Sequence, residues 1–364
     1  MKEIQELKQN LRASLEEALS SLKSFQECAL LSYPDHYNIG DHLIWLGEIL
    51  YLTDVLGIRP EYCASVASFS DREMEEKLDR KQPILIHGGG NLGDLWGYYQ
   101  NFYEKIISQY PDRPIVILSQ SLIFRYESKL NRAREIFNNH PDLTLIAREN
   151  QSYRLALQYF PKCKVFKAPD LALQLIDLPS LSLPPDRSDT ILYLRRQDQE
   201  LNTASSPDIL DLPNLVVEDW SSYQNKGKPA LNSIGGLTVL FQEGWREGSL
   251  LPREWVSRQL WKQFHPYTAK FKNLDNSSLH LTSWNYAHNG IYQFSPHRLV
   301  ITSRLHGHIL CIILGIPHVF LANAYHKNES FYETWSHGIP FCKFARDPSE
   351  VKEATRKLLS LSPA

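Results

Sequence analysis

The sequence predicts an α/β protein built on parallel β-sheets. Apolar segments of strand length alternate with segments of helical periodicity along most of the 364 residues, which is the order expected of β-α-β units. Hydrophobic residues make up 43% of the chain and charged residues 22%, so there are enough apolar side chains for sheets covered by helices on both faces. The length favours two domains.

The charge and the cysteines argue against several classes of protein. The formal net charge is -2 and no run of Lys and Arg stands out, so we expect no nucleic-acid partner. The five cysteines are scattered without a C-x-x-C pair, which argues against a disulfide framework or a zinc knuckle and favours a reducing, cytoplasmic setting. No apolar run approaches the roughly 20 residues of a membrane span, and the N-terminal residues do not resemble a signal peptide.

The first domain is expected over residues 1–180. An amphipathic helix over 2–27 leads it, because Ile4, Leu7 and Leu11 recur at steps of three and four. Strands and helices then alternate. The expected strands lie at 28–34, 61–68, 83–90, 114–121, 143–149 and 164–170, and the expected helices at 42–57, 97–110, 127–139 and 152–160.

The second domain is expected over residues 181–364, because the proline-rich, aperiodic segment 175–189 reads as a linker. An amphipathic helix is expected at 349–361, and we expect it to pack back on the first domain. The expected strands lie at 190–196, 214–220, 279–284, 298–303, 318–321 and 340–345.

The segment 299–321 holds the strongest functional signal. It reads as an apolar strand, a polar turn, an apolar helix closed by Gly315 and a second apolar strand. Ser303 is the expected N-cap, which places Arg304 and His306 in the helix's first turn. Positively charged side chains are unfavourable at the positive, N-terminal end of the helix dipole. Their presence therefore indicates that an anion binds the backbone N–H groups at this helix end. The alternative is an ion pair between Arg304 and a nearby carboxylate.

Two Asn-x-Gly-Asp segments follow strand ends in the first domain. They run from Asn38 to Asp41, including Gly40, and from Asn91 to Asp94. Ligands of open α/β sheets bind at the carboxyl ends of the strands, so the residues of both segments are candidate cleft residues. Asp41 could alternatively serve the turn and cap the helix that follows.

Gly88, Gly89 and Gly90 end the strand expected at 83–90. With Gly93 they form the G-x-G-x-x-G pattern of dinucleotide-binding sites. The acidic residue expected at the end of the next strand is missing, because that position reads Ser-Gln-Ser. A close approach of a ligand, or of the facing domain, to Gly89 and Gly90 explains the glycines better.

Basic residues of the second domain complete the candidate site. Arg195 and Arg196 end its first strand, and their side chains should point to opposite faces. One of them is expected to reach the same cleft as Arg304, unless it pairs with an acidic residue just beyond. His306 and His308 form an H-x-H pair without a third ligand at a recognisable spacing, so we expect no metal and treat His308 as a candidate cleft residue.

Taken together, these residues resemble the polysaccharide pyruvyl transferase family. The resemblance covers most of the chain in order, although no single motif is specific. The family often has Asp before its Arg-Leu-His, and this chain has Ser303 there. The matching segments are 38–41 with its apolar helix, 88–90, 119–121, 148–149 with Ser152, 169–170, the strand ending in Arg196, and 304–306.

The resemblance implies two Rossmann-like domains facing across a cleft, as in GT-B glycosyltransferases. It implies transfer of a pyruvyl group from phosphoenolpyruvate, a co-substrate rather than a cofactor, to a sugar of an exopolysaccharide or cell-surface glycan precursor. On that basis Arg196, Arg304, Leu305 and His306 bind phosphoenolpyruvate. His306 is also the candidate acid. The base could be Asp41, Asp94 or a second histidine, and the sequence does not choose among them; the scheme requires no metal.

The acceptor on this reading is a lipid-linked oligosaccharide. The protein would then work in the cytoplasm at the inner face of the membrane, with peripheral contact through tryptophans. The irregular segment 221–278 is expected to carry acceptor specificity. Neither the acceptor sugar nor an oligomeric state is predicted.

Two other functions fit the same architecture. The first is a GT-B nucleotide-sugar glycosyltransferase, which needs a pocket for a base and a ribose, and the sequence shows no clear signal for one. The second is a non-catalytic partner in glycan assembly that uses the tryptophan-rich segment 220–284.

Overall fold

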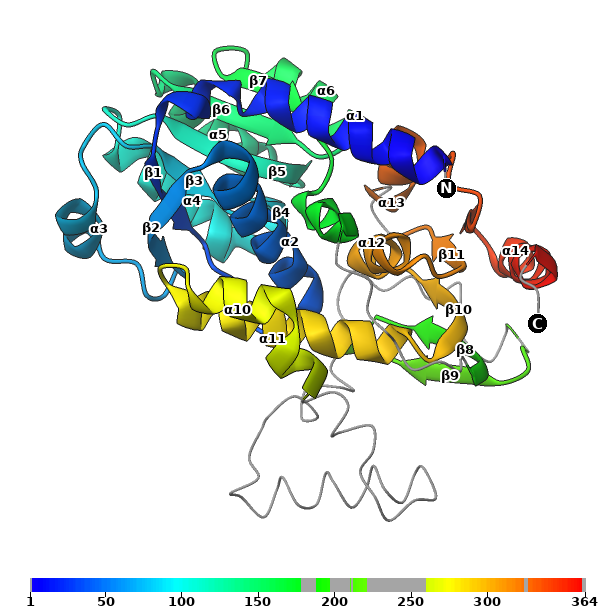
Figure 1. Ribbon diagram of the computed structural model, residues 1–364. Coiled ribbons are helices and arrows are strands. Elements are labelled where there is room, and N and C mark those ends of the chain that lie inside the picture. The colour runs from blue at the N-terminus through cyan, green and yellow to red at the C-terminus, as the bar shows by residue number, and fades with distance from the viewer. Residues whose placement is uncertain are drawn as a thin grey trace.

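The computed structural model describes residues 2–177, 188–196, 210, 212–220, 260–323 and 327–361. It contains two sheets of parallel strands with helices packed against them (Figure 1). The predicted α/β class with parallel sheets is therefore confirmed. The domain boundary predicted near residue 180 falls in 178–187, outside the described residues.

The larger sheet has seven strands in the order β2-β1-β3-β5-β6-β7, with β4 paired to β5. The single strand expected at 83–90 is split into β3 and β4. Gly89, at the start of β4, adopts a φ of +123°, which glycine takes far more readily than other residues. The strands are β1 Glu27–Leu31, β2 Arg59–Ala64, β3 Ile84–Ile86, β4 Gly89–Gly93, β5 Ile115–Ile123, β6 Leu143–Ala147 and β7 Lys164–Lys167.

Helices cover both faces of this sheet. Met74, Phe102, Ala133 and Ala156 bring α3, α4, α5 and α6 into the apolar cluster on its outer face. The helical elements are α1 Lys2–Ala18, η1 Ser20–Ser24, α2 Ile39–Leu50, η2 Tyr51–Leu56, α3 Asp71–Lys77, η3 Asp94–Trp96, α4 Gly97–Gln109, α5 Glu127–Asn139, α6 Asn150–Tyr159 and η4 Leu171–Asp177.

The smaller sheet has five parallel strands in the order β12-β11-β10-β8-β9. Its strands are β8 Ser188–Leu194, β9 Leu215–Glu218, β10 His297–Thr302, β11 His318–Leu321 and β12 Cys342–Ala345. The accompanying helices are α10 Pro266–Lys272, α11 Ser277–Phe294, α12 Leu305–Leu314, α13 Lys327–Phe331, η7 Tyr332–Ser336 and α14 Pro348–Leu361. Among the described residues, no helix has both the length and the apolar character required to cross a membrane.

Two sequence predictions for this half are wrong. Residues 279–284 were expected to form a strand but lie in α11, where His280, Trp284 and Ile291 are buried on one helical face. A six-residue window shows alternation, whereas the helical period appears only over the whole 18-residue helix. The terminal helix α14 packs on β10, β11 and β12 rather than on the first half of the chain.

The two sheets share one helical layer. α2 packs against η4, α11 and α12 (Figure 1), and apolar residues from both halves form one cluster around it. Every residue of α2 is buried, including the polar Asp41, His42 and Glu48. Its backbone is approached so closely that a Cβ on Gly47 would lie 1.9 Å from the carbonyl oxygen of Leu171. This packing sets the N-terminus of α2 beside that of α12.

Candidate active site

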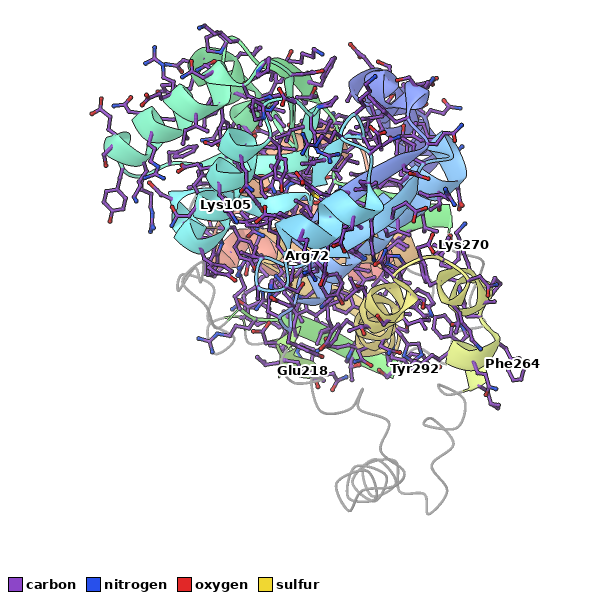
Figure 2. All side chains as sticks on the ribbon, turned by 90° about the vertical axis from the view of Figure 1, so that its left-hand side faces the viewer. Arg72, Lys105, Glu218, Phe264, Lys270 and Tyr292 are labelled. Atoms are coloured by element: carbon purple, nitrogen blue, oxygen red, sulfur yellow. The ribbon has the colours of Figure 1, made fainter. Side chains whose placement is uncertain are left out.

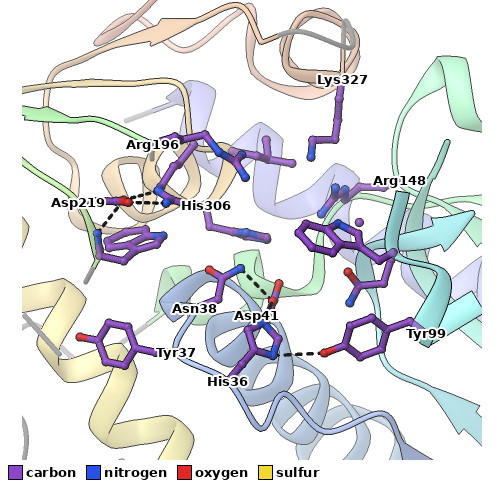
Figure 3. A pocket seen from close by; sticks show the side chains of 16 residues that line it. His36, Tyr37, Asn38, Asp41, Tyr99, Arg148, Arg196, Asp219, His306 and Lys327 are labelled. Carbon is purple, nitrogen blue, oxygen red and sulfur yellow. Dashed lines mark hydrogen bonds and ion pairs between the residues drawn. The ribbon is translucent and has the colours of Figure 1, made fainter. Parts of the chain in front are cut away.

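A cavity of about 350 Å³ lies beyond the carboxyl ends of strands from both sheets (Figure 3), where ligands of open α/β sheets bind. Its volume is within the range of small-molecule sites, roughly 300–1,000 Å³. The lining residues are His36, Tyr37, Asn38, Asp41, Gly90, Asn91, Trp96, Tyr99 and Arg148 from the first half of the chain, and Arg196, Asp219, Trp220, Arg304, Leu305, His306 and Lys327 from the second.

Most of the predicted site residues come together here. Eight of them line the cavity, although they are separated by up to 268 positions in the sequence (from 38 to 306). Of the two arginines that end β8, Arg196 lines the cavity. The eight are Asn38, Asp41, Gly90, Asn91, Arg196, Arg304, Leu305 and His306.

Four cationic side chains converge on this cavity from four different elements. They belong to Arg148, Arg196, Arg304 and Lys327, and each residue is at most 9% exposed. Two carboxylates also line the cavity, so with neutral histidines the described part of the lining carries an excess of two positive charges. Such an excess in a partly buried site favours a multiply charged anion.

Arg304 is held in a fixed orientation by a carboxylate. Its Nε lies 2.6 Å and its Nη2 2.8 Å from the two carboxylate oxygens of Asp219, which is the bidentate geometry of a strong ion pair. The ion pair that the sequence left as an alternative is therefore present, and Arg304 lines the cavity as well.

The N-terminus of α12 points its backbone at the same cavity. Arg304, not Ser303, is the N-cap residue, and no side chain caps the helix. The first-turn N–H groups of an α-helix have no partner within the helix, so an anion at this end can accept hydrogen bonds from them. The side chains of Leu305 and His306 lie at this end of the cavity.

His306 is anchored by a buried carboxylate. Its Nε2 lies 3.2 Å from Oδ2 of Asp170, and the same oxygen accepts a 2.8 Å hydrogen bond from Arg148. Burial raises the pKa of Asp170, but His306 and Arg148 lower it more, so this carboxyl stays ionised. The His306 ring rests directly on Gly40, where a Cβ would lie 2.3 Å from its Nδ1. Gly40 therefore shapes the site from behind the lining.

Asp41 forms part of a second imidazole–carboxylate pair. Its Oδ2 lies 2.9 Å from His36 Nε2 and accepts a 2.9 Å hydrogen bond from Asn38. The N-cap of α2 is Asn38, whose side chain accepts from the N–H of Gly40, so Asp41 does not serve as the cap. Burial raises the pKa of Asp41, but the hydrogen bond and charge of His36, with smaller contributions from other histidines, hold it well below the usual value.

Besides Gly40, two predicted cleft residues of the first half lie outside the lining. Asp94 accepts hydrogen bonds from the backbone N–H groups of Arg125 and Tyr126, both at 2.7 Å, and pairs with the Arg125 side chain. It therefore ties η3 to the end of β5. Gly89 also does not line the cavity; it supplies the backbone conformation that places Gly90 there.

The prediction that His308 is a cleft residue is wrong. Successive helical residues are about 100° apart, so His308 points away from the side that carries His306 and is fully buried. It belongs to a cluster with His318 and Cys342, whose ligand atoms lie within 4.8 Å of one another. Of the described residues, this cluster alone has the spacing to hold a metal ion, and it lies away from the cavity.

Hydrogen bonds account for the same cluster without an ion. His318 Nδ1 donates to the carbonyl of Ile316 at 2.9 Å, so its Nε2 accepts from His308 Nδ1 at 2.7 Å. Ser336 then donates to His308 Nε2 at 2.9 Å. Both rings are neutral in this arrangement, which agrees with burial lowering the pKa of His318 to about 4.

Comparison with known proteins identifies the family. A family model described as polysaccharide pyruvyl transferase matches residues 38–325. The chain belongs to the polysaccharide pyruvyl transferase family. It is 30% identical over 341 residues to EpsO of Bacillus subtilis (strain 168), named as a provisional pyruvyl transferase, with 94% of this chain and 95% of EpsO covered. It is 28% identical to pyruvyl transferase 1 of Schizosaccharomyces pombe, covering 92% of this chain and 75% of that protein.

A solved structure agrees with the fold. The crystal structure of KP1_0663, an uncharacterised protein from Klebsiella pneumoniae, superposes with a TM-score of 0.57, covering 92% of this chain and 98% of that one. The two sequences are 19% identical, so this likeness supports the fold alone.

Several cavity residues of this pyruvyl transferase family member were not predicted as site residues. Arg148 was named only within the matching segment 148–149, yet it also lines the cavity. Asp219 was not singled out, although it follows a strand end, the signal that marked other site residues. Lys327 and His36 carry no motif of their own, and only the folded chain brings them to the cavity.

Proposed function

We propose that this protein transfers a pyruvyl group from phosphoenolpyruvate to two hydroxyls of a sugar in a polysaccharide precursor. The observation that carries the proposal is the convergence of four cationic side chains and the N-terminus of α12 on one cavity that also holds His306. Phosphoenolpyruvate is small and carries a phosphate and a carboxylate. Guanidinium groups bind both kinds of anion well.

In the proposed complex, Arg304 and Arg196 neutralise the phosphate and the carboxylate of phosphoenolpyruvate. The backbone N–H at Leu305 adds a hydrogen-bond donor along the helix dipole. Arg148 and Lys327 approach from the other side of the cavity. Both lie beside Gly90, where an added Cβ would be 3.7 Å from Nη2 of Arg148 and 3.7 Å from Nζ of Lys327. Both can compensate the charge of the departing phosphate.

The reaction needs one acid step and two deprotonations. A proton added to C3 of phosphoenolpyruvate makes C2 electrophilic, and the first sugar hydroxyl adds to C2. Phosphate then leaves, and the second hydroxyl closes the ketal. Of the two hydroxyl protons lost, one balances the proton taken up by the new methyl group and the other ends on phosphate. His306 is the proposed proton donor, since imidazole transfers protons near neutral pH.

The same arrangement supports a GT-B-like description of the molecule. Each sheet directs the carboxyl ends of its strands toward the cavity, and residues of both halves line it. We therefore assign the cavity to a cleft between two Rossmann-like halves, with no resident cofactor or metal in the reaction.

The acceptor is proposed to bind on the aromatic side of the cavity. Tyr37, Trp96, Tyr99 and Trp220 lie among the lining residues, and aromatic rings with polar tips suit a sugar. A lipid-linked acceptor would bring the protein to a membrane surface. Phe264, which is 75% exposed and projects from the edge of the molecule in Figure 2, supports such a contact. The predicted acceptor segment lies mostly outside the described residues, at 221–259.

Donor specificity can be tested by thermal shift and product mass. Phosphoenolpyruvate should raise the unfolding temperature, whereas UDP and GDP should not. Incubation with phosphoenolpyruvate and a panel of lipid-linked oligosaccharides should release phosphate and yield an acceptor heavier by pyruvate less one water. Stabilisation by a nucleotide alone would instead favour a nucleotide-sugar glycosyltransferase.

A further inference from the structure

We infer that His36 is the base that accepts the proton of the attacking sugar hydroxyl, and that Asp41 is its positioning residue. The inference rests on the proposed pyruvyl transfer and deepens it. It assigns the role of base, for which the sequence left Asp41, Asp94 and a second histidine open, to a residue near Asp41 that belongs to no recognised motif.

The geometry around His36 is that of an oriented base. Its Nε2 lies 2.9 Å from Oδ2 of Asp41, and that carboxylate is fixed by the amide of Asn38. The Asp41 side chain is 11% exposed, whereas that of His36 is 42% exposed. A sheltered carboxylate behind an accessible imidazole is the arrangement by which enzymes hold a histidine in one tautomer.

The hydrogen bonds also identify the basic nitrogen. Since ionised Asp41 can only accept, Nε2 of His36 carries the proton and Nδ1 carries the lone pair. Nδ1 lies 3.3 Å from the hydroxyl of Tyr99 (Figure 3). Burial raises the pKa of Tyr99 above its usual value, so this hydroxyl is a donor. A hydrogen bond of this length is weak, and an acceptor hydroxyl can replace it.

The cavity contains two imidazole–carboxylate pairs in different surroundings. In Figure 3, His306 lies between the cationic side chains on one side and His36, Tyr37 and Tyr99 on the other. The pair of His306 with Asp170 adjoins Arg148 and so faces the donor's anionic groups. The pair of His36 with Asp41 adjoins the aromatic rings of the acceptor side. The proposed reaction adds a proton to phosphoenolpyruvate and removes one from the sugar, so it can use both imidazole–carboxylate pairs.

The proposed step balances. As the sugar oxygen forms its bond to C2, the O–H bond breaks and the proton goes to Nδ1 of His36, which becomes an imidazolium stabilised by Asp41. A lone pair of the sugar oxygen forms the new C–O bond, and the electron pair of the broken O–H bond remains on that oxygen as a lone pair. The imidazolium returns its proton to the departing phosphate or to water, so the enzyme ends in its starting state.

The groups around His36 set its pKa and therefore the pH dependence expected of kcat. The hydrogen bond to Asp41, with the charges of Asp41 and Asp35, raises the pKa of His36 above its usual value. Tyr99 faces Nδ1, and His42 Nε2 bonds the backbone carbonyl of His36. Because a base must be unprotonated, kcat should rise with pH along an ascending limb that belongs to His36.

Two variants separate a catalytic from a structural role. His36→Gln should lower kcat about 100-fold and remove the ascending limb, while the affinity for phosphoenolpyruvate stays within about twofold. Asp41→Asn should keep the limb but move it to lower pH, because the imidazole loses the carboxylate that favours its charged form. Free imidazole should restore activity to His36→Ala in proportion to its unprotonated fraction. His337→Gln, an exposed histidine outside the cavity, is the matched control and should behave like the wild type.

Failure of the inference differs from failure of the proposed function. If the wild type releases no phosphate from phosphoenolpyruvate with any acceptor, the proposed function itself fails. If the wild type is active but His36→Gln retains both its kcat and the ascending limb, the assignment of His36 is overturned. It is equally overturned if the limb stays in place in Asp41→Asn.

Discussion

Single side chains decide what the cavity can bind. Arg304 is fixed by both oxygens of Asp219, so its guanidinium is already oriented when the substrate arrives, which reduces the entropy lost on binding. Lysine cannot reproduce this planar, two-pronged contact. The strand-end position of Arg304 could be predicted from the sequence. Its carboxylate partner could not, because Asp219 lies 85 positions away, just after the end of another strand.

We predict that Arg304→Ala loses turnover of phosphoenolpyruvate while the fold remains intact. Loss of one preorganised donor to an oxyanion costs about 100- to 1,000-fold in kcat, and the unpaired Asp219 adds repulsion toward the substrate. Steady-state kinetics measure the turnover, and far-UV circular dichroism shows whether the fold is intact. Arg346→Ala removes an exposed guanidinium paired to Glu329 and should leave turnover unchanged; full activity in Arg304→Ala would remove the site assignment.

We predict that Gly40→Ala impairs catalysis and also destabilises the fold. The new Cβ would lie 2.3–2.7 Å from three atoms of His306, so the ring must move, and a shift of about 1 Å in a catalytic group can cost about 100-fold. Because the Cβ of His306 lies at 2.7 Å and cannot rotate away, the starts of α2 and α12 must also separate, and the unfolding temperature should fall.

The comparison for Gly40 is Gly338→Ala. A Cβ on Gly338 meets nothing within 4 Å, so that variant should keep wild-type kinetics. Unchanged kcat in Gly40→Ala would mean that the position of His306 against Gly40 does not matter for the reaction.

At the scale of elements, the termini of two helices define the site. α2 is buried along its whole length, and the contacts with η4, α11 and α12 fix where Asn38 and Asp41 emerge. The strands and most helices follow from hydrophobic periodicity and were predicted. The helix at 277–294 and the split between β3 and β4 were not predicted. Whether a short alternating segment forms a strand, and which conformation a glycine adopts, depend on neighbours that lie outside the short stretch of sequence considered.

We predict that Gly47→Ala destabilises the protein. Its Cβ would lie 1.9 Å from the carbonyl oxygen of Leu171, a backbone atom that cannot rotate away, so η4 must separate from α2. Overpacking of this kind costs about 1–3 kcal/mol, measurable as a lower midpoint of urea unfolding. Gly97→Ala, where a Cβ meets nothing within 4 Å, should change the midpoint little; an unchanged midpoint in Gly47→Ala would contradict the tight packing of this layer.

At the scale of the whole molecule, the site exists only because both sheets share one layer of helices. The cavity collects residues from position 36 to position 327, and no local pattern connects them. The sequence could therefore predict which strand ends carry functional side chains. It could not predict which of those side chains meet, since that depends on how the sheets pack through α2, α11 and α12.

We predict that stability falls as the pH drops below about 6.5. Six buried histidines have lowered pKa values, so the unfolded chain binds protons that the folded chain does not bind, and stability is lost between pH 6.5 and about 4. His36 and His87 have raised pKa values and oppose this only in part. The six are His42, whose pKa burial lowers to about 3, His265, His280 and His318, to about 4, His308, well below 6.5, and His140, below its usual value.

Urea unfolding at a series of pH values measures this effect. The free energy of unfolding should decrease by on the order of 2–4 kcal/mol between pH 6.5 and about 5, a range in which ordinary carboxyls remain mostly ionised. A free energy that stays constant over this range would show that these histidines are not buried as neutral groups.

The claim on which the account rests is that phosphoenolpyruvate binds between the N-terminus of α12 and the basic residues of the facing elements. A crystal structure of the protein soaked with phosphoenolpyruvate tests it most directly. We predict density for the phosphate and the carboxylate within hydrogen-bonding distance of Arg304 and Arg196, with C3 facing His306. An empty cavity at saturating phosphoenolpyruvate, or a molecule bound elsewhere on the surface, would contradict the account.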